Sequence, residues 1–76
     1  MSYTLGEIVR FHRKKAGLSQ EELAKFAGVG KTVIFDIEKG KLTIQFDTLN
    51  KILAVLNISI TFESPLMNIL EKNEDS

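Results

Sequence analysis

The chain lacks several features that mark other classes of protein. It has no cysteine, so it forms no disulfide and offers no thiolate ligand to a metal, which fits a reducing compartment. It has one histidine and no glycine-rich phosphate loop, and no carboxylates are paired at a catalytic spacing. No apolar run approaches a membrane span, and no basic segment followed by an apolar run opens the chain. We therefore expect a cytoplasmic, non-enzymatic protein with no cofactor, no metal and no membrane contact.

An excess of charge of one sign is also absent, but the charges are unevenly distributed. The 76 residues have a formal net charge of zero. Residues 1–62 carry nine Lys or Arg against six Asp or Glu, whereas residues 63–76 carry one lysine against four acids. Residues 1–62 are therefore mildly basic, which suffices for a few phosphate contacts but not for tight non-specific binding to nucleic acid. Specific binding is therefore expected to need two copies of this small domain.

The most informative segment predicts two short helices joined by a glycine turn, over residues 20–27 and 31–39. Ser19 and Glu22 have the spacing of a capping box, in which each side chain bonds to the other residue's backbone. Gly28 is placed to adopt the positive φ that ends the first of these helices, and Gly40 ends the second. This arrangement is typical of a helix-turn-helix, whose second helix enters the major groove of DNA.

Two further helices are predicted around this unit. One covers about 4–16, beginning at Thr4 with Glu7 three residues later, and the other covers 47–56. Their inward faces are expected to consist of Leu5, Ile8, Val9, His12 and Ala16, and of Phe46, Leu49, Ile52, Leu53 and Leu56. The lone histidine is expected to be a partly buried core residue. Asn57 is a reasonable end for the last helix.

Residues 58–63 change to a strict alternation of apolar and polar side chains, which predicts a β-strand. It is the only strand candidate in the chain, so its backbone groups find no partner within one copy. We expect a homodimer in which two such strands pair antiparallel, with Ile58, Ile60 and Phe62 packing over the helices. The alternative is a frayed C-terminal extension. The first domain is thus assigned to residues 1–63.

Residues 64–76 are expected to form a short acidic tail. Ser64-Pro65 breaks the strand pattern and is followed by the apolar cluster Leu66, Met67, Ile69 and Leu70. This cluster forms either a short helix packed on the dimer or a disordered motif that folds on a partner. The sequence leaves both possibilities open.

The chain resembles the phage-repressor-like (Cro/CI, or XRE) helix-turn-helix domains over about residues 8–56. The residues that carry the resemblance are Arg13, Gly17 to Ala24, Gly28-Val29, Ile34, Ile37 to Gly40, and Phe46 to Leu49. The resemblance implies an all-α, lambda-repressor-like helical bundle that binds double-stranded DNA in a sequence-specific manner as a transcriptional repressor. It also implies that Arg13 and Glu38 form a structural pair between the first and third helices.

A fourth helix that runs into a strand resembles, more narrowly, the HipB-type antitoxins. Members of that group dimerise through the strand and bind their own operator, and their partner is a HipA-type toxin kinase. The resemblance therefore implies an autoregulatory antitoxin of a toxin-antitoxin system, acting on a palindromic operator. A different hypothesis is a protein-interaction adaptor that uses the fold without binding DNA, which the acidic Asp36 and the neutral net charge favour slightly.

The candidate DNA-binding residues are Gln20, Gly30, Lys31, Thr32, Phe35, Asp36, Lys39, Lys41 and Thr43. Gln20 opens a helix whose free amides favour a phosphate. Lys31 can donate to guanine, and Thr32 can bond a base edge or contact a thymine methyl group. Each of these three also fits an ordinary surface position.

The remaining candidates each allow more than one role. Phe35 is expected to contact thymine methyls or sugars, unless it is a core residue. Asp36 can accept a hydrogen bond from cytosine but repels phosphate, and many relatives carry a basic or amide residue there. Gly30 can cap its helix only through the backbone, which permits a close approach to phosphate. Lys39, Lys41 and Thr43 are candidate phosphate contacts or simply solvated residues.

Overall fold

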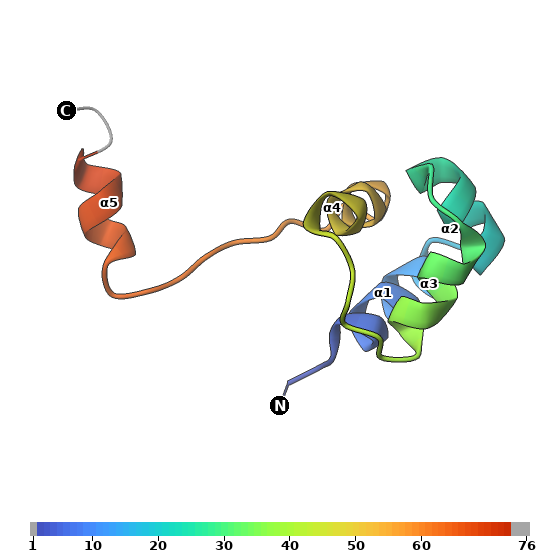
Figure 1. The fold of residues 1–76 in the computed structure, drawn as a ribbon. Coiled ribbons are helices and arrows are strands. Elements are labelled where there is room, and N and C mark those ends of the chain that lie inside the picture. Colours follow the sequence, from blue (N-terminus) through green and yellow to red (C-terminus); the bar gives the residue numbers. More distant parts are fainter. Residues whose placement is uncertain (1, 74–76) are drawn as a thin grey trace.

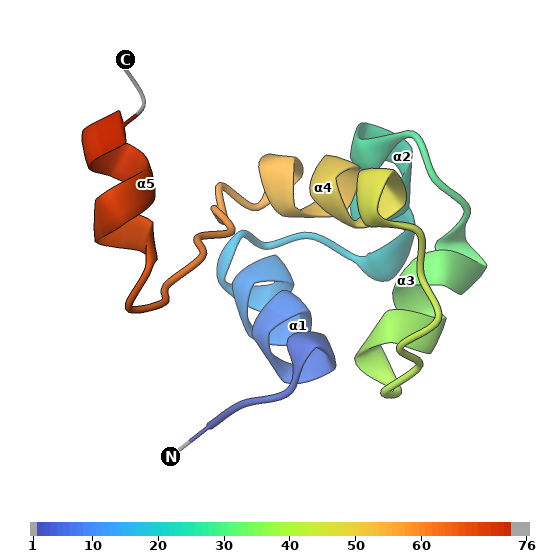
Figure 2. The same ribbon diagram turned by 60° about the vertical axis from the view of Figure 1, so that its left-hand side comes forward.

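The computed structural model describes residues 2–73, which form five helices. The helices are α1 (Leu5–Lys15), α2 (Gln20–Ala27), α3 (Lys31–Glu38), α4 (Phe46–Val55) and α5 (Met67–Asn73). The first four form a bundle in which α3 packs on α1 and α2, and α4 packs on α2. Figures 1 and 2 show α5 standing apart from this bundle at the end of an extended segment. The predicted helical bundle is confirmed, with helix boundaries within one residue of those expected.

The helices begin and end where the sequence predicts, because local caps satisfy their free backbone groups. Both capping boxes form: Thr4 exchanges hydrogen bonds with Glu7, and Ser19 exchanges them with Glu22. Gly28 ends α2 with φ +72°. Asn57 follows α4 with φ +62°, and the Ile58 amide donates to Leu53 O at 2.9 Å.

The core lies between the four helices of the bundle. Its buried apolar side chains are Val9, Leu23, Ala24, Ala27, Ile34, Ile37, Ile52, Leu53 and Leu56. Leu18, Val29 and Ile58 are half-buried against this cluster. Leu23 and Ile34 are fully buried, which fixes the angle between α2 and α3 and leaves the opposite face of α3 in solvent.

Gly6 lets α1 approach the end of α3 at backbone distance. A methyl group added there would overlap the carbonyl oxygen of Ile37 and lie 3.1 Å from Glu38 Cα. Any side chain at this position would therefore push the two helices apart. Nothing in the sequence pattern indicates this contact, because it joins residues about thirty positions apart.

The predicted β-strand at 58–63 is not present in the single chain. Within residues 2–73 the structure contains helices, turns and extended connections but no strand. Ile58 is half-buried on the core, whereas Ile60 and Phe62 are exposed, the latter at 72%. A strand exists only where a second extended segment accepts its backbone hydrogen bonds, and one copy provides none in its described part.

Two smaller expectations are wrong. Phe46, expected on the inward face of its helix, is the first residue of α4 and is exposed. Ala16 is likewise exposed, since it follows the last turn of α1. In the tail, residues 67–73 form a short helix in which Ile69 and Leu70 are exposed; residues 74–76 lie outside the described part.

Candidate nucleic-acid interface

The outward face of α3 forms one continuous stripe. Ile34 and Ile37 are buried, so the residues on the opposite side of the helix face outward; all of them are exposed except Asp36, which is half-buried. These are Lys31, Thr32, Phe35, Asp36 and Lys39. The structure therefore brings five of the nine sequence-predicted residues onto a single helix face. Gly30 precedes the stripe as an N-cap with no side-chain hydrogen bond, so the amides of the first turn of α3 remain uncapped by a side chain.

Phe35 is 45% exposed and does not belong to the core. The Lys39 ammonium lies 5.0 Å from the centre of its ring, within range of a cation–π contact. This contact holds a positive charge beside an apolar surface on the exposed side of α3. Such a combination suits a surface that meets both sugars or methyl groups and phosphates.

Asp36 is paired within the chain. Lys41 Nζ lies 3.7 Å from its carboxylate, and both side chains are partly exposed. The pair therefore contributes little to stability, but Lys41 offsets the negative charge of the stripe. Asp36, Lys41 and Thr43 also line one shallow cavity of about 170 Å³ between α3 and the loop after it. The sequence reasoning missed this pairing, because residues five apart are not neighbours on a continuous helix; the turn after α3 brings them together.

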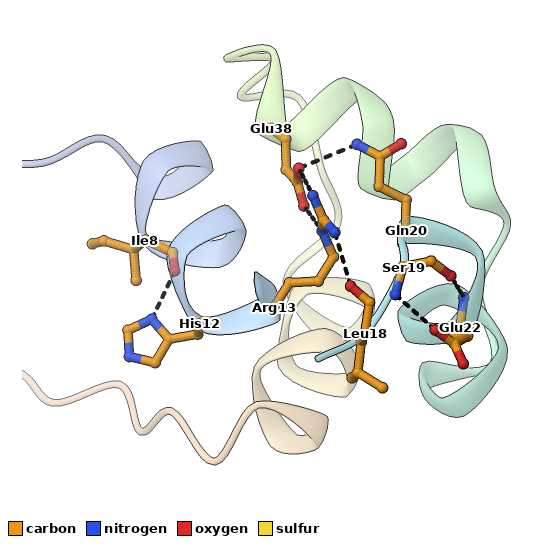
Figure 3. A network of polar contacts seen from close by, with 8 residues as sticks. All are labelled: Ile8, His12, Arg13, Leu18, Ser19, Gln20, Glu22 and Glu38. Carbon is orange, nitrogen blue, oxygen red and sulfur yellow. Dashed lines mark hydrogen bonds and ion pairs between the residues drawn. The ribbon is translucent and has the colours of Figure 1, made fainter. Parts of the chain in front are cut away.

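Gln20 opens α2, as predicted, and its side chain also has a partner within the chain. Its side-chain amide donates to Glu38 Oε1 at 3.1 Å (Figure 3). The same carboxylate accepts from Arg13 Nε at 2.7 Å and from Arg13 Nη2 at 3.0 Å. Arg13 Nη1 donates to Leu18 O at 2.9 Å. This network ties α1, α2 and α3 together and holds the Gln20 side chain beside Glu38, next to the free amides at the start of α2.

The Arg13–Glu38 pair is almost entirely buried, with side chains 10% and 5% exposed. Burial alone would raise the pKa of Glu38, but hydrogen bonds from Arg13 and Gln20 and the charge of Arg13 outweigh it and lower the pKa. The hydrogen bonds to Glu38 raise the pKa of Arg13. The pair is therefore ionised near neutral pH, and it fixes the orientation of α3 relative to the start of α2.

Other kinds of site find no support in the described residues. Over 2–73, no three His, Cys, Asp or Glu side chains converge as a metal site would require. Over the same residues, no helix is both long enough and apolar enough to span a bilayer.

Comparison with known proteins is decisive for the fold. A family model described as helix-turn-helix matches residues 9–62, more than half of the chain. The chain belongs to the helix-turn-helix family. This confirms the phage-repressor-like fold that the motif predicts.

Three similar proteins illustrate the range of the family. The chain is 43% identical over 61 residues to y4mF, an HTH-type transcriptional regulator of Sinorhizobium fredii, and this match covers 80% of each chain. A crystal structure of SinR, described as a master regulator for biofilm formation, in complex with DNA has a TM-score of 0.69 and 35% identity, covering 74% of this chain and 90% of that one. HipB in a HipA–HipB–O2–O3 complex has a TM-score of 0.72 and 28% identity, covering 86% and 96%. The chain spans 51% of the full SinR of Bacillus subtilis.

Proposed function

We propose that this helix-turn-helix chain is a transcriptional regulator that binds double-stranded DNA in a sequence-specific manner. The observation that carries the proposal is the exposed stripe of α3, with Lys31 and Thr32 at its leading end beside the uncapped amides of that helix. A helix presented in this way enters the major groove with its N-terminal residues against base edges. The similarity to SinR, which was crystallised with DNA, supports the same use of the fold.

In this proposal, Lys31 and Thr32 read bases, and Phe35 contacts methyl groups or sugars. Lys39, Lys41, Thr43 and the backbone at Gly30 contact phosphates, together with the free amides of α2 that begin at Gln20. Asp36 tunes the contact by excluding phosphate from its vicinity while Lys41 limits the repulsion.

The test is fluorescence anisotropy on duplex DNA from the region upstream of the gene, with a scrambled duplex as control, over a salt series. Lys31→Ala should raise the Kd for the native duplex by about tenfold or more and change the scrambled duplex far less. Lys51→Ala, which removes an exposed lysine from α4, is the matched control and should leave the preference intact. Absent or equal binding of the wild type to both duplexes would favour the adaptor hypothesis instead. A preference for the native duplex that survives Lys31→Ala would refute the base contact assigned to Lys31.

We also propose that the chain acts as a two-fold dimer formed through residues 58–62. Ile60 and Phe62 are exposed beyond the half-buried Ile58, although both are large and apolar. Antiparallel pairing with a second copy would satisfy the backbone groups of this segment and cover those side chains. Two recognition helices related by the two-fold would then meet half-sites about one helical turn apart.

Side chains alternate between the two sides of this extended segment, so a substitution on the opposite side serves as the control for the dimer experiment. Ile60→Asp places a charge on the side that would be covered, so sedimentation equilibrium should show the dimer Kd raised by about tenfold to a hundredfold. Thr61→Asp places the same charge one residue later, on the opposite side, and should have a much smaller effect. Equal effects of the two substitutions would rule out strand pairing of this kind.

An autoregulatory antitoxin role is the more specific form of the proposal. It is supported by the similarity to HipB, which covers 86% of the chain and was solved with HipA. The chain is then expected to bind a HipA-type toxin kinase encoded beside it and the operator upstream of both genes. Co-expression of the two proteins should yield a stable complex that retains operator binding, and the failure of an adjacent kinase to co-purify would refute this role.

A further inference from the structure

Helix α5 and the residue before it present an apolar face that nothing within residues 2–73 covers. Leu66, which directly precedes the helix, is 69% exposed, Ile69 and Leu70 are 55% and 61% exposed, and no residue of α5 is buried. In both views of the fold the helix stands away from the four-helix bundle (Figures 1 and 2). An isolated helix of seven residues is not stable in water, so α5 needs a surface to pack against.

An apolar surface of suitable size lies on α1. A cavity of about 490 Å³ is lined by Tyr3, Glu7, Ile8, Phe11 and His12, hereafter the α1 groove. Tyr3 and Phe11 are both exposed. His12 Nδ1 donates to Ile8 O at 2.7 Å, and the rings of Phe11 and His12 meet edge to face at 5.5 Å. These contacts hold the groove open without burying it, and His12 points away from the Arg13–Glu38 network (Figure 3).

The charges around the two surfaces are complementary. Lys15 is exposed on α1, and its Nζ lies 5.6 Å from the centre of the Phe11 ring at the groove; the exposed Lys14 precedes it. The segment that carries α5 is acidic: residues 63–76 hold four acids against one lysine. The acidic composition of this segment is thus complementary to the lysines at one end of the α1 groove, whereas Glu7 lines the other end.

We propose that α5 of one chain docks into the α1 groove of a second copy, with Leu66, Ile69 and Leu70 covering Phe11 and Tyr3. Within one chain α5 lies away from the bundle, so the groove is left open to the other copy. In a two-fold dimer the contact occurs twice, because each chain gives its helix and receives one. The proposal rests on the dimer proposed above, and it adds a second, reciprocal contact to that dimer.

The absence of cysteine provides a clean background for a cross-linking test on the full chain. Lys15→Cys places a thiol at the edge of the groove, and Glu71→Cys places one on α5, without altering the apolar residues of either surface. Because a disulfide requires Cα atoms within about 7 Å, a mixture of the two single variants should give a mixed disulfide-linked dimer under mild oxidation. Lys25→Cys, on the exposed side of α2, mixed with Glu71→Cys is the control and should give much less.

Further variants test whether the α1 groove binds α5 of a second copy or α5 of the same chain. Adding Leu70→Asp to the Glu71→Cys chain, or Phe11→Asp to the Lys15→Cys chain, should reduce the mixed cross-link at least about tenfold, since each buries a charge in an apolar contact. Both positions are exposed in the single chain, so circular dichroism should show an unchanged fold. A Lys15→Cys, Glu71→Cys double variant that forms only an intrachain disulfide would overturn the proposal in favour of docking within one copy. Cross-linking no better than the Lys25→Cys control would overturn it outright.

Sedimentation equilibrium and operator binding of the wild type separate this contact from the proposed function. A dimer that binds its operator but shows no selective cross-link would refute the α5 contact alone. If the wild type shows no specific DNA binding but the cysteine variants still give the selective cross-link, the proposed function is refuted and the α5 contact stands.

Discussion

The Arg13–Glu38 pair should be a principal determinant of stability, and a double-mutant cycle tests this directly. Glu38 accepts three hydrogen bonds, two from Arg13 and one from Gln20, and the pair is shielded from solvent. Removing one partner of a buried ion pair leaves the other charge uncompensated, which costs about 3–5 kcal/mol. A domain of 76 residues has a free energy of unfolding of about 4–11 kcal/mol. Glu38→Ala is therefore expected to remove about a quarter or more of the total.

The assay is urea denaturation followed by far-ultraviolet circular dichroism, for the wild type, Arg13→Ala, Glu38→Ala and the double variant. The double variant has no uncompensated charge. The free energies of unfolding lost in the two single variants should therefore sum to about 2 kcal/mol or more above the loss in the double variant. The exposed Lys41–Asp36 pair, at 3.7 Å, is the internal control and should give a coupling below about 0.5 kcal/mol. A coupling for Arg13 and Glu38 as small as that of the control would refute the reasoning.

Three further predictions follow from the same structure. Gly6→Ala should lower the free energy of unfolding by about 1–3 kcal/mol despite the better helix propensity of alanine, because the methyl group meets the backbone at Ile37, and unchanged or increased stability in urea would contradict that contact. Stability should fall on acidification: the folded pKa of Glu38 lies below its unfolded value, so its contribution is complete above the unfolded pKa of about 4.5 and is lost as pH falls through the folded pKa. Glu38→Gln should flatten that decline in thermal unfolding measured against pH, and an equally steep decline would count against the assignment. Asp36→Asn should tighten binding to the scrambled duplex by a few-fold, roughly the gain from removing one acid near phosphates, whereas weaker binding in anisotropy would show that this carboxylate does not face the DNA backbone.

The helices and their ends could be predicted because the signals for them are local. Ser19 with Glu22, and Thr4 with Glu7, are three residues apart and cap their own helices whatever else the chain does. Gly28 marks the turn because few other residues adopt its positive φ. The spacing of apolar residues then identified the buried face of α3. The residues outside that spacing form the outward stripe, which is the candidate site.

The missed features depend on contacts between distant residues. Gly6 looks like a poor helix residue until α3 lies against it. The bond from the Gln20 side chain to Glu38 joins residues eighteen positions apart, so local spacing does not reveal it. The alternation in 58–63 predicted a strand paired across a homodimer, and the described part of the single chain contains no strand, because pairing needs two segments.

The sequence by itself determined the helix-turn-helix family and the outward residues of α3, since capping, turn geometry and apolar period act within a few residues. Only the tertiary structure decided which polar side chains are already engaged. Arg13, Gln20 and Glu38 satisfy one another inside the fold, and Lys41 is held beside Asp36. Lys31 and Thr32 remain exposed at the start of α3, where α1 and α2 hold the helix in position. The physical reason is that a polar group's partner is chosen by proximity in three dimensions, which local spacing does not encode.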